Sequence, residues 1–166
     1  MANITLKGNQ IHTNGDLPAI GSKAPDFKLT NADLKDVSLA DFQGKKKLFN
    51  IFPSLDTSVC AASTKKFNDY AKAAKNSVML MTSADLPFAM GRFCHEQDLN
   101  NVISLSMLRS KDFAKDYGVL ITDGPLAGLC ARAVVVLDEN DKVIYTELVP
   151  EIAQEPDYET AVAALK

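Results

Sequence analysis

The chain has 166 residues, a formal net charge of −3, 46% hydrophobic residues and 23% charged residues. These values are typical of a soluble globular protein, and the length predicts one domain spanning residues 1–166. The acidic balance excludes the basic surface of a nucleic-acid binder, because the longest lysine run covers only residues 45–47. No segment approaches the ~18 consecutive apolar residues that a membrane-spanning helix needs.

The N-terminus and the cysteines predict a cytoplasmic protein. Residues 1–15 contain no basic region followed by an apolar stretch, so no secretory signal peptide is expected. The three cysteines form an odd number, which is a poor basis for the disulfide framework of a secreted protein. Neither the cysteines nor the two histidines show the spacing of metal ligands, and no cofactor is expected.

The first half of the chain predicts a hairpin, a buried strand and a long helix. Residues 3–15 alternate apolar and polar side chains around Gly8-Asn9, which indicates a β-hairpin. Residues 45–54, KKKLFNIFPS, contain an apolar run that is typical of a central strand buried on both faces. The apolar spacing then becomes helical over residues 58–75.

The other elements complete an alternation of strands and helices. They are expected in this order: short strand or loop segments at 24–31 and 36–42, a buried strand at 77–84, a helix at 87–97, a strand at 101–108, a short helix at 112–118, a strand pair within 131–149 and a last helix at 156–166. This order predicts a three-layer α/β or thioredoxin-like architecture.

The stretch FPSLDTSVCAAS, residues 52–63, lies where the buried strand gives way to the long helix. Pro53 breaks the strand and can shield the following residues from water. Asp56 and Thr57 are competent N-cap residues, which places Cys60 in the first helical turn, with the Thr57 hydroxyl in reach of the sulfur. Backbone N–H groups at a helix start favour a thiolate, so Cys60 is a candidate nucleophile. The alternative is a small core residue.

A thiolate at this position needs further positive charge, because a helix terminus supplies only ~0.3–2 kcal/mol of stabilisation. Arg132 is the best candidate, since it directly precedes the apolar run at 133–137. A guanidinium always carries its charge and is rarely buried without a partner. The alternative is that Arg132 lies at the exposed mouth of the strand.

These residues resemble the active-site motif of the peroxiredoxins, P-x-x-x-T-x-x-C, at Pro53, Thr57 and Cys60. The segments SADLPFA, RFC, DGPLAGL and ARAVVVLDEN are similar to those of the bacterial thiol peroxidase subfamily, and the similarity extends over nearly the whole chain. The resemblance implies an α/β thioredoxin-like fold, in which a central mixed β-sheet is flanked by helices and preceded by an N-terminal β-hairpin extension. It also implies the reduction of hydrogen peroxide and organic hydroperoxides.

The resemblance implies a role for each candidate residue. Cys60 matches the peroxidatic cysteine, which attacks the peroxide and becomes a sulfenic acid. Thr57 and Arg132 match the residues that hydrogen-bond the peroxide and the thiolate, and Pro53 matches the residue that shields the pocket. Cys94 matches the resolving cysteine, which implies an intramolecular Cys60–Cys94 disulfide. This arrangement is that of an atypical two-cysteine peroxiredoxin.

The same resemblance implies thioredoxin as the reductant and a homodimer that packs near the active-site loops. Both Cys60 and Cys94 lie on predicted helices, whereas a disulfide needs their Cα atoms within ~7 Å. Local unwinding of one or both segments is therefore expected during turnover.

Two residues near the predicted site are given structural interpretations. Cys130 stands where alanine is usual in the subfamily, and on a strand it would share a face with Arg132. A small buried side chain is the preferred interpretation of this thiol. His95 follows Cys94 but faces another direction on a helix, which predicts a surface histidine.

Two other functions stay open on the residues alone. CAAS, residues 60–63, has the C-x-x-S form of monothiol thioredoxin-fold proteins, which exchange disulfides and do not reduce peroxides. The second is a non-catalytic binding domain on the same fold, with its cysteines as core residues. In that case Cys94 is a packed helix residue beside Phe93.

Overall fold

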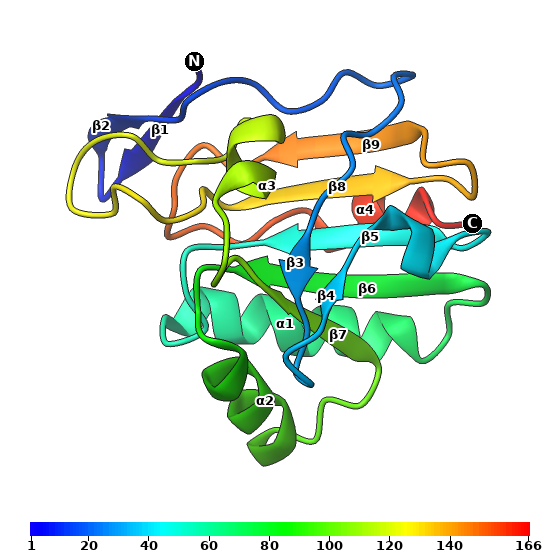
Figure 1. Cartoon of the computed structure of the whole chain (residues 1–166). Helices are drawn as coiled ribbons and strands as arrows, with labels where there is room; N and C mark the ends of the chain where they lie inside the picture. The colour runs from blue at the N-terminus through cyan, green and yellow to red at the C-terminus, as the bar shows by residue number, and fades with distance from the viewer.

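The computed structural model describes all 166 residues and contains two β-sheets, with helices around the larger one (Figure 1). The N-terminal hairpin consists of β1 (Asn3–Leu6) and β2 (Asn9–His12). The larger sheet has the strand order β4-β3-β7-β6-β5-β8-β9. Its strands are β3 (Leu29–Thr30), β4 (Asp36–Val37), β5 (Lys46–Ile51), β6 (Ser77–Ser83), β7 (Val102–Ser106), β8 (Ala133–Leu137) and β9 (Val143–Leu148). The helices are the 3-10 helix η1 (Leu39–Phe42), α1 (Ser58–Ala71), α2 (Pro87–Glu96), α3 (Asp112–Asp116) and α4 (Tyr158–Ala163).

The central strand β5 confirms the predicted strand that is buried on both faces. It pairs in parallel with β6 and antiparallel with β8. Residues 47–51 are all buried. Its apolar residues Leu48, Phe49 and Ile51 are all fully buried without alternation, as is typical of a strand covered on both faces. Because β6 also pairs in parallel with β7, the carboxyl ends of β5, β6 and β7 meet at one edge of the sheet.

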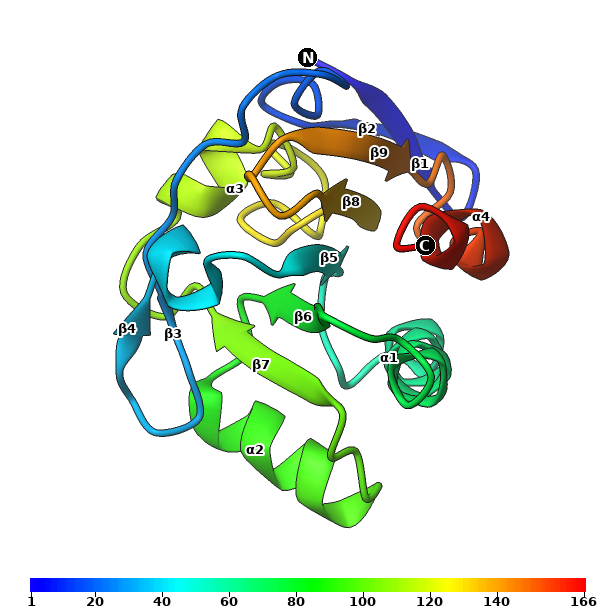
Figure 2. The same ribbon diagram turned by 90° about the vertical axis from the view of Figure 1, so that its right-hand side faces the viewer.

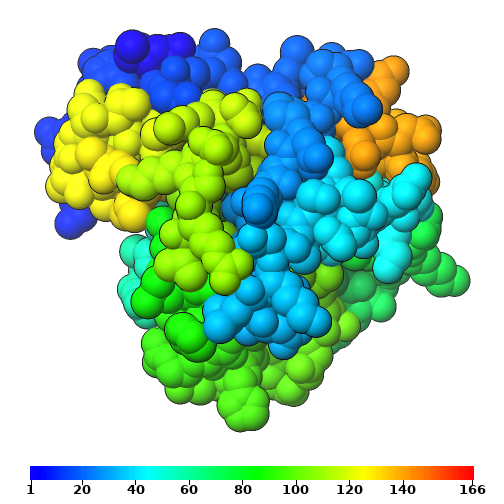
Figure 3. All heavy atoms as spheres, in the orientation of Figure 1, coloured from blue at the N-terminus to red at the C-terminus, as the bar shows by residue number.

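Helices cover both faces of the larger sheet, as Figure 2 shows. α1 and α4 lie on one face, where Phe67 and Tyr158 pack with their ring centroids 5.1 Å apart. The N-terminal segment and α3 cover the opposite face (Figure 3), and α2 packs against β7. None of the helices is long and apolar enough to cross a membrane. A mixed sheet flanked by helices, with a separate N-terminal hairpin, confirms the predicted thioredoxin-like fold.

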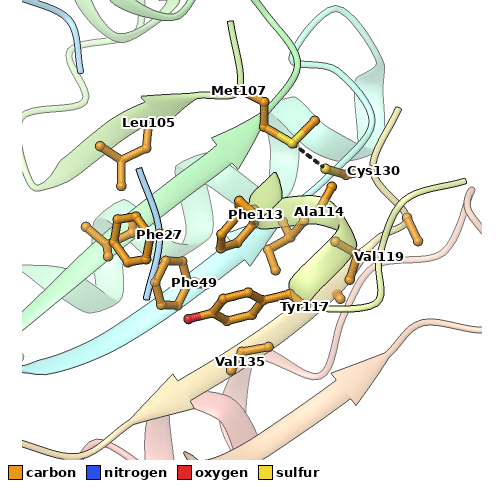
Figure 4. Packing of buried hydrophobic residues seen from close by; sticks show 14 of the residues in the cluster. Phe27, Phe49, Leu105, Met107, Phe113, Ala114, Tyr117, Val119, Cys130 and Val135 are labelled. Atoms are coloured by element: carbon orange, nitrogen blue, oxygen red, sulfur yellow. Dashed lines mark hydrogen bonds between the residues drawn. The ribbon is translucent and has the colours of Figure 1, made fainter. Parts of the chain in front are cut away.

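An aromatic cluster fills the space between the sheet and α3 (Figure 4). The ring centroid of Phe49 on β5 lies 5.5 Å from that of Phe27 and 5.6 Å from that of Phe113. Phe113 and Tyr117 stack at 4.4 Å, and the Tyr117 hydroxyl donates to the Pro25 carbonyl at 2.9 Å. Such aromatic pairs contribute ~0.5–1.5 kcal/mol each beyond their burial. They anchor α3 on the sheet, so the segment that leads from α3 to β8 starts from a fixed point.

The long helix ends earlier than predicted. α1 stops at Ala71, whereas the periodicity predicts a helix through residue 75. The N–H groups of Ala73 and Ala74 donate to the carbonyls of Tyr70 and Ala71, which closes a tight turn in place of further helix. Asn76 then has a left-handed φ of 53° and directs the chain into β6.

Two glycines with positive φ are expected to differ sharply in their tolerance of alanine. Gly118 has a φ of +70°, and a Cβ there would lie 2.0 Å from the Asp16 carbonyl oxygen. Gly8 has a φ of +81°, with no atom within 4 Å of an added Cβ. Gly8→Ala should therefore cost only the left-handed penalty of ~1–2 kcal/mol, whereas Gly118→Ala should cost ~3 kcal/mol or more.

Urea unfolding of the two variants at neutral pH checks the expected difference in the free energy of unfolding. If both variants lost the same free energy of unfolding, the close packing of Gly118 against Asp16 would not be what requires glycine there.

Candidate active site

The predicted site lies at the edge where the carboxyl ends of β5, β6 and β7 meet, on the left in Figure 1. Buried Pro53 follows β5 and cannot donate to the strand ladder, so the chain leaves the sheet there. The next turn is closed by Ser54, whose carbonyl accepts hydrogen bonds from Thr57 N–H at 3.2 Å and Thr57 Oγ1 at 3.0 Å. α1 then begins at Ser58.

Thr57 and Cys60 are in contact, as the spacing predicts. Cys60 is the third residue of α1 and is fully buried. Thr57 occupies the N-cap position, but its side chain makes no capping hydrogen bond. Its Oγ1 instead lies 2.7 Å from Cys60 Sγ and 3.0 Å from the Ser54 carbonyl oxygen. A hydroxyl has one proton to donate, so Thr57 serves one of these two acceptors at a time.

Arg132 supplies the positive charge, and it is buried. Only 1% of the residue is exposed, so it does not lie at an exposed strand mouth. Its Nη2 donates to Cys60 Sγ at 3.3 Å and its Nε donates to the Ile152 carbonyl at 2.8 Å. Its Nη1 is buried without a hydrogen-bond partner. The guanidinium therefore places its charge beside the sulfur and keeps one nitrogen without an acceptor.

The N-terminal hairpin holds the support of Arg132 in place through Glu151. The Glu151 carboxylate accepts hydrogen bonds from Thr5 Oγ1 at 2.6 Å, Lys7 N–H at 3.0 Å and Gly8 N–H at 3.1 Å. The neighbouring Ile152 N–H donates to the Thr5 carbonyl at 2.9 Å. These bonds fix the position of the Ile152 carbonyl that Arg132 contacts. The sequence pattern did not point to Glu151, because its partners lie up to 146 residues away along the chain.

Cys94 lies close to the site in a different environment. It is the eighth residue of α2, half-buried, and packs against a small apolar cluster that includes Cys60. Its Sγ lies 3.8 Å from Met81 Sδ, and burial raises the pKa of its thiol. All three cysteines are free thiols. The buried members of the cluster are Phe52, Leu55, Cys60, Met81 and Met90.

Cys130 does not share the face of Arg132, so that expectation is wrong. The Cys130 thiol lies 3.4 Å from Met107 Sδ in the large core cluster (Figure 4), whereas Arg132 faces Cys60. β8 begins only at Ala133, so the alternation of a strand does not extend back to residue 130. Burial, together with the Asp85 carboxylate, raises the pKa of Cys130 to about 12. Cys130 is a core residue, which agrees with the interpretation preferred from the sequence.

Thr57 and Cys94 line separate surface pockets. A pocket of about 420 Å³ is lined by Thr57 together with Arg92 and Phe93 of α2. Cys94 lines a second pocket of about 330 Å³ on another face of α2. His95 is exposed, as predicted. No three His, Cys, Asp or Glu side chains gather in a group that could hold a metal ion.

Comparisons with known proteins agree with this geometry. The Redoxin family matches residues 19–162. The thiol peroxidase of Mycobacterium tuberculosis is 56% identical over 165 residues, which cover 99% of each chain. A peroxiredoxin-like protein from Aquifex aeolicus superposes with a TM-score of 0.93 and 37% identity, covering 99% of this chain and 96% of the other. A thiol peroxidase from Chromobacterium violaceum gives a TM-score of 0.89 and 26% identity over 96% of this chain and 93% of the other.

The chain therefore belongs to the Redoxin family, and within that family to the peroxiredoxins. It is an enzyme with the activity of a thiol-dependent peroxidase, the class of its full-length relatives. These findings favour the peroxidase over the two alternatives, the monothiol disulfide exchanger and the non-catalytic binding domain.

Glu151→Gln is expected to reduce the dependence of the free energy of unfolding on pH in the acidic range. The hydrogen bond from Thr5, followed by those from the backbone N–H groups of Gly8, Ala153 and Lys7, lowers the pKa of Glu151 to about 2. In the unfolded chain a glutamate titrates near ~4.3. Its contribution to the free energy of unfolding is therefore present above that value and lost as the pH falls toward about 2.

Chemical denaturation across this pH range checks the expectation. Wild type and Glu151→Gln should differ at neutral pH and converge in strong acid. Glu139→Gln, on the exposed β8–β9 turn, makes the same charge change without these hydrogen bonds and is the matched control. A difference between wild type and Glu151→Gln that does not vary with pH would contradict the assignment.

Proposed function

We propose that Cys60 carries the reaction as the peroxidatic thiolate. The observation that carries this proposal is that Thr57 Oγ1 and Arg132 Nη2 converge on one buried sulfur, at 2.7 and 3.3 Å, at the start of a helix. The thiolate attacks the terminal oxygen of the hydroperoxide, so that an S–O bond forms and the O–O bond breaks. The leaving oxygen takes up a proton and departs as water or alcohol, and the sulfur becomes a sulfenic acid.

Arg132 is proposed to bind the peroxide as well as the thiolate. Its buried Nη1 has no partner, and a buried donor without an acceptor costs ~1–3 kcal/mol, or more when it is charged. A peroxide oxygen beside the sulfur is a suitable acceptor for this group. The guanidinium and the Thr57 hydroxyl then stabilise the negative charge as it moves from sulfur to the leaving oxygen.

Pro53 and the apolar cluster around Cys60 are proposed to limit the access of water. Pro53 and Phe52 are both buried at the end of β5, next to the turn that leads to Thr57. In such a site the electrostatic contacts of Arg132 are stronger than they would be in bulk water. The approach for substrate is the pocket of about 420 Å³ beside Thr57. Its mixture of apolar and charged lining residues is compatible with both hydrogen peroxide and organic hydroperoxides.

Cys94 is proposed to be the resolving cysteine. Its thiol attacks the Cys60 sulfenic acid, forming the Cys60–Cys94 disulfide and releasing water. While α2 is folded, the raised pKa of Cys94 keeps the thiol protonated, so it does not compete with Cys60 for peroxide. Its sulfur contacts Met81, and a disulfide requires the two sulfurs to be ~2 Å apart. Because both free thiols are held within helices, part of α1 or α2 is proposed to unwind so that the two sulfurs can meet.

The disulfide is proposed to be reduced by thioredoxin in the cytoplasm. Closure of a ~34-residue loop stabilises the oxidised chain by roughly 3.8 kcal/mol in the chain-entropy model. Unwinding of helical turns offsets part of this stabilisation, which leaves a disulfide that a protein dithiol can reduce by exchange. The two electrons pass from the dithiol to the disulfide, which regenerates both cysteine thiols.

A homodimer is proposed to form near the active-site loops. Leu86, Phe88 and Leu108 are 52%, 69% and 45% exposed. They lie near one another, because Ser106, two residues before Leu108, donates to the carbonyl of Asp85, which precedes Leu86. Clustered exposed apolar side chains are typical of an interaction surface.

Peptide mapping under non-reducing conditions tests the roles of the cysteines. Reduced protein is treated with one equivalent of an organic hydroperoxide, and free thiols are then alkylated. The expected product is a Cys60–Cys94 peptide with Cys130 still available for alkylation after unfolding. Cys94→Ser should stop at the sulfenic or sulfinic acid of Cys60, and Cys130→Ala should turn over peroxide at a near-normal rate.

The outcomes separate the assignments. Oxidation of Cys60 without the disulfide would remove Cys94 as the resolving residue. An unoxidised Cys60 would contradict its role as the nucleophile, and a large loss of activity in Cys130→Ala would show that the third thiol takes part.

Sedimentation equilibrium tests the dimer. The wild type should have twice the 18.0 kDa mass of one chain. Phe88→Asp places a charge in the proposed interface and should give the mass of one chain. Ile20→Asp, at a residue that is 65% exposed elsewhere on the surface, should not change the mass. A monomeric wild type would exclude the proposed interface.

A further inference from the structure

Three serines at the carboxyl ends of three parallel strands converge on one residue, Asp85: two donate to its carboxylate and one to its backbone carbonyl. Ser83 ends β6 and Ser106 ends β7, and the two residues are register partners across the sheet. Ser54 follows the end of β5. Ser54 Oγ donates to Asp85 Oδ1 at 2.7 Å, Ser83 Oγ donates to Asp85 Oδ2 at 2.6 Å, and Ser106 Oγ donates to the Asp85 carbonyl. We call this group the Asp85 junction.

The Asp85 junction also holds the backbone of the loop that leads to Cys60. The N–H of Leu55 donates to Asp85 Oδ2 at 2.8 Å. A half-buried carboxylate thus accepts hydrogen bonds from two hydroxyls and one backbone amide. Hydrogen bonds to a charged acceptor are worth about twice as much as neutral ones. Two of these three bonds, from Ser54 and Leu55, join the Asp85 loop to the Cys60 loop.

Ser54 connects Asp85 to Thr57, because it forms hydrogen bonds with both residues. The Ser54 carbonyl accepts hydrogen bonds from both N–H and Oγ1 of Thr57, and Ser54 Oγ accepts one from Asp56 N–H at 3.2 Å. Thr57 in turn contacts Cys60 Sγ at 2.7 Å. Hydrogen bonds therefore connect Asp85 through Ser54 to the Thr57 N–H, which leaves the Thr57 hydroxyl able to donate to the sulfur.

Asp85 also stands at the entrance to the helix that carries Cys94. It directly precedes Leu86, the N-cap of α2. The Asp85 junction therefore links the two segments that bear the reacting thiols. If Cys60 leaves its position at the start of α1 to meet Cys94, the loop before it must move. The hydrogen bonds from Ser54 and Leu55 to Asp85 would oppose this movement.

We propose that Asp85 is a positioning residue that holds the loop at residues 54–57 in the form that reacts with peroxide and delays its opening for disulfide formation. This inference rests on the proposed roles of Cys60 and Cys94. With the junction intact, Thr57 is aligned with the sulfur and attack on peroxide is fast. The sulfenic acid then has two fates. It is oxidised by a second peroxide to the sulfinic acid, with release of water or alcohol, or the loop opens and Cys94 forms the disulfide with release of water.

Asp85→Asn tests the proposal, because it keeps the size of the side chain and replaces one acceptor oxygen with a donor. Reduced protein is mixed rapidly with tert-butyl hydroperoxide at increasing excess, and the oxidised forms of Cys60 are quantified by mass spectrometry. The second-order rate constant for Cys60 oxidation should fall ~10- to 100-fold, as expected when a reacting group is misplaced. The sulfinic fraction at high peroxide should fall severalfold, because the loop opens sooner.

Two further variants make the test specific. Ser54→Ala removes one bond of the Asp85 junction and should move both readouts in the same directions by a smaller amount. Asp138→Asn is the control, since this carboxylate also accepts backbone hydrogen bonds, from Asn140 and Lys142. It lies at the other end of the sheet, after β8, and should change neither readout.

An unchanged sulfinic fraction, or an unchanged rate constant, in a folded Asp85→Asn protein overturns the proposal. If Asp85→Asn does not fold, the same two readouts of Ser54→Ala decide it. A wild type that never forms the Cys60–Cys94 disulfide would instead refute the proposed role of Cys94, while the rate constants would still test the alignment of Thr57 by Asp85.

Discussion

The contact between the buried Arg132 guanidinium and the Cys60 sulfur is the interaction on which the rest of the site depends. A buried charge is costly unless hydrogen bonds and an opposite charge offset the loss of water. Here the partners are the Ile152 carbonyl and the sulfur, while one nitrogen stays free. Because no carboxylate forms an ion pair with Arg132, its positive charge acts mainly on the Cys60 sulfur. The hairpin, Glu151 and β8 together hold the guanidinium in this orientation.

The Cys60 and Cys94 thiols are the same chemical group in different surroundings. Cys60 has hydrogen-bond donors on two sides, at the start of a helix. Cys94 has a thioether neighbour and apolar burial, which raises the pKa of its thiol. This contrast orders the proposed reaction, since the first thiol is prepared for peroxide and the second becomes reactive when its helix opens. Cys130 is enclosed in the core beside Met107.

The parallel strands explain why the site forms where it does. The carboxyl ends of β5, β6 and β7 meet at one edge, and each strand brings a serine to that edge. The hydrogen bonds of the Asp85 junction join the ends of the three strands. They therefore connect the loop before Cys60 with the loop before α2. The opposite end of the sheet carries turns such as the one at Asp138, which bear none of the reacting groups.

The sequence by itself determined the local features: the doubly buried strand β5, the helix start just before Cys60, the contact of Thr57 with Cys60 three residues later, and the candidate charge at Arg132. These follow from periodicity and from short spacings, which are properties of neighbouring residues. Only the tertiary structure decided that Arg132 is buried against Cys60, that Cys130 faces Met107, and that Glu151 and Asp85 support the site. Their partners are distant in the chain, or depend on where a strand begins, and neither local propensity nor spacing specifies such contacts.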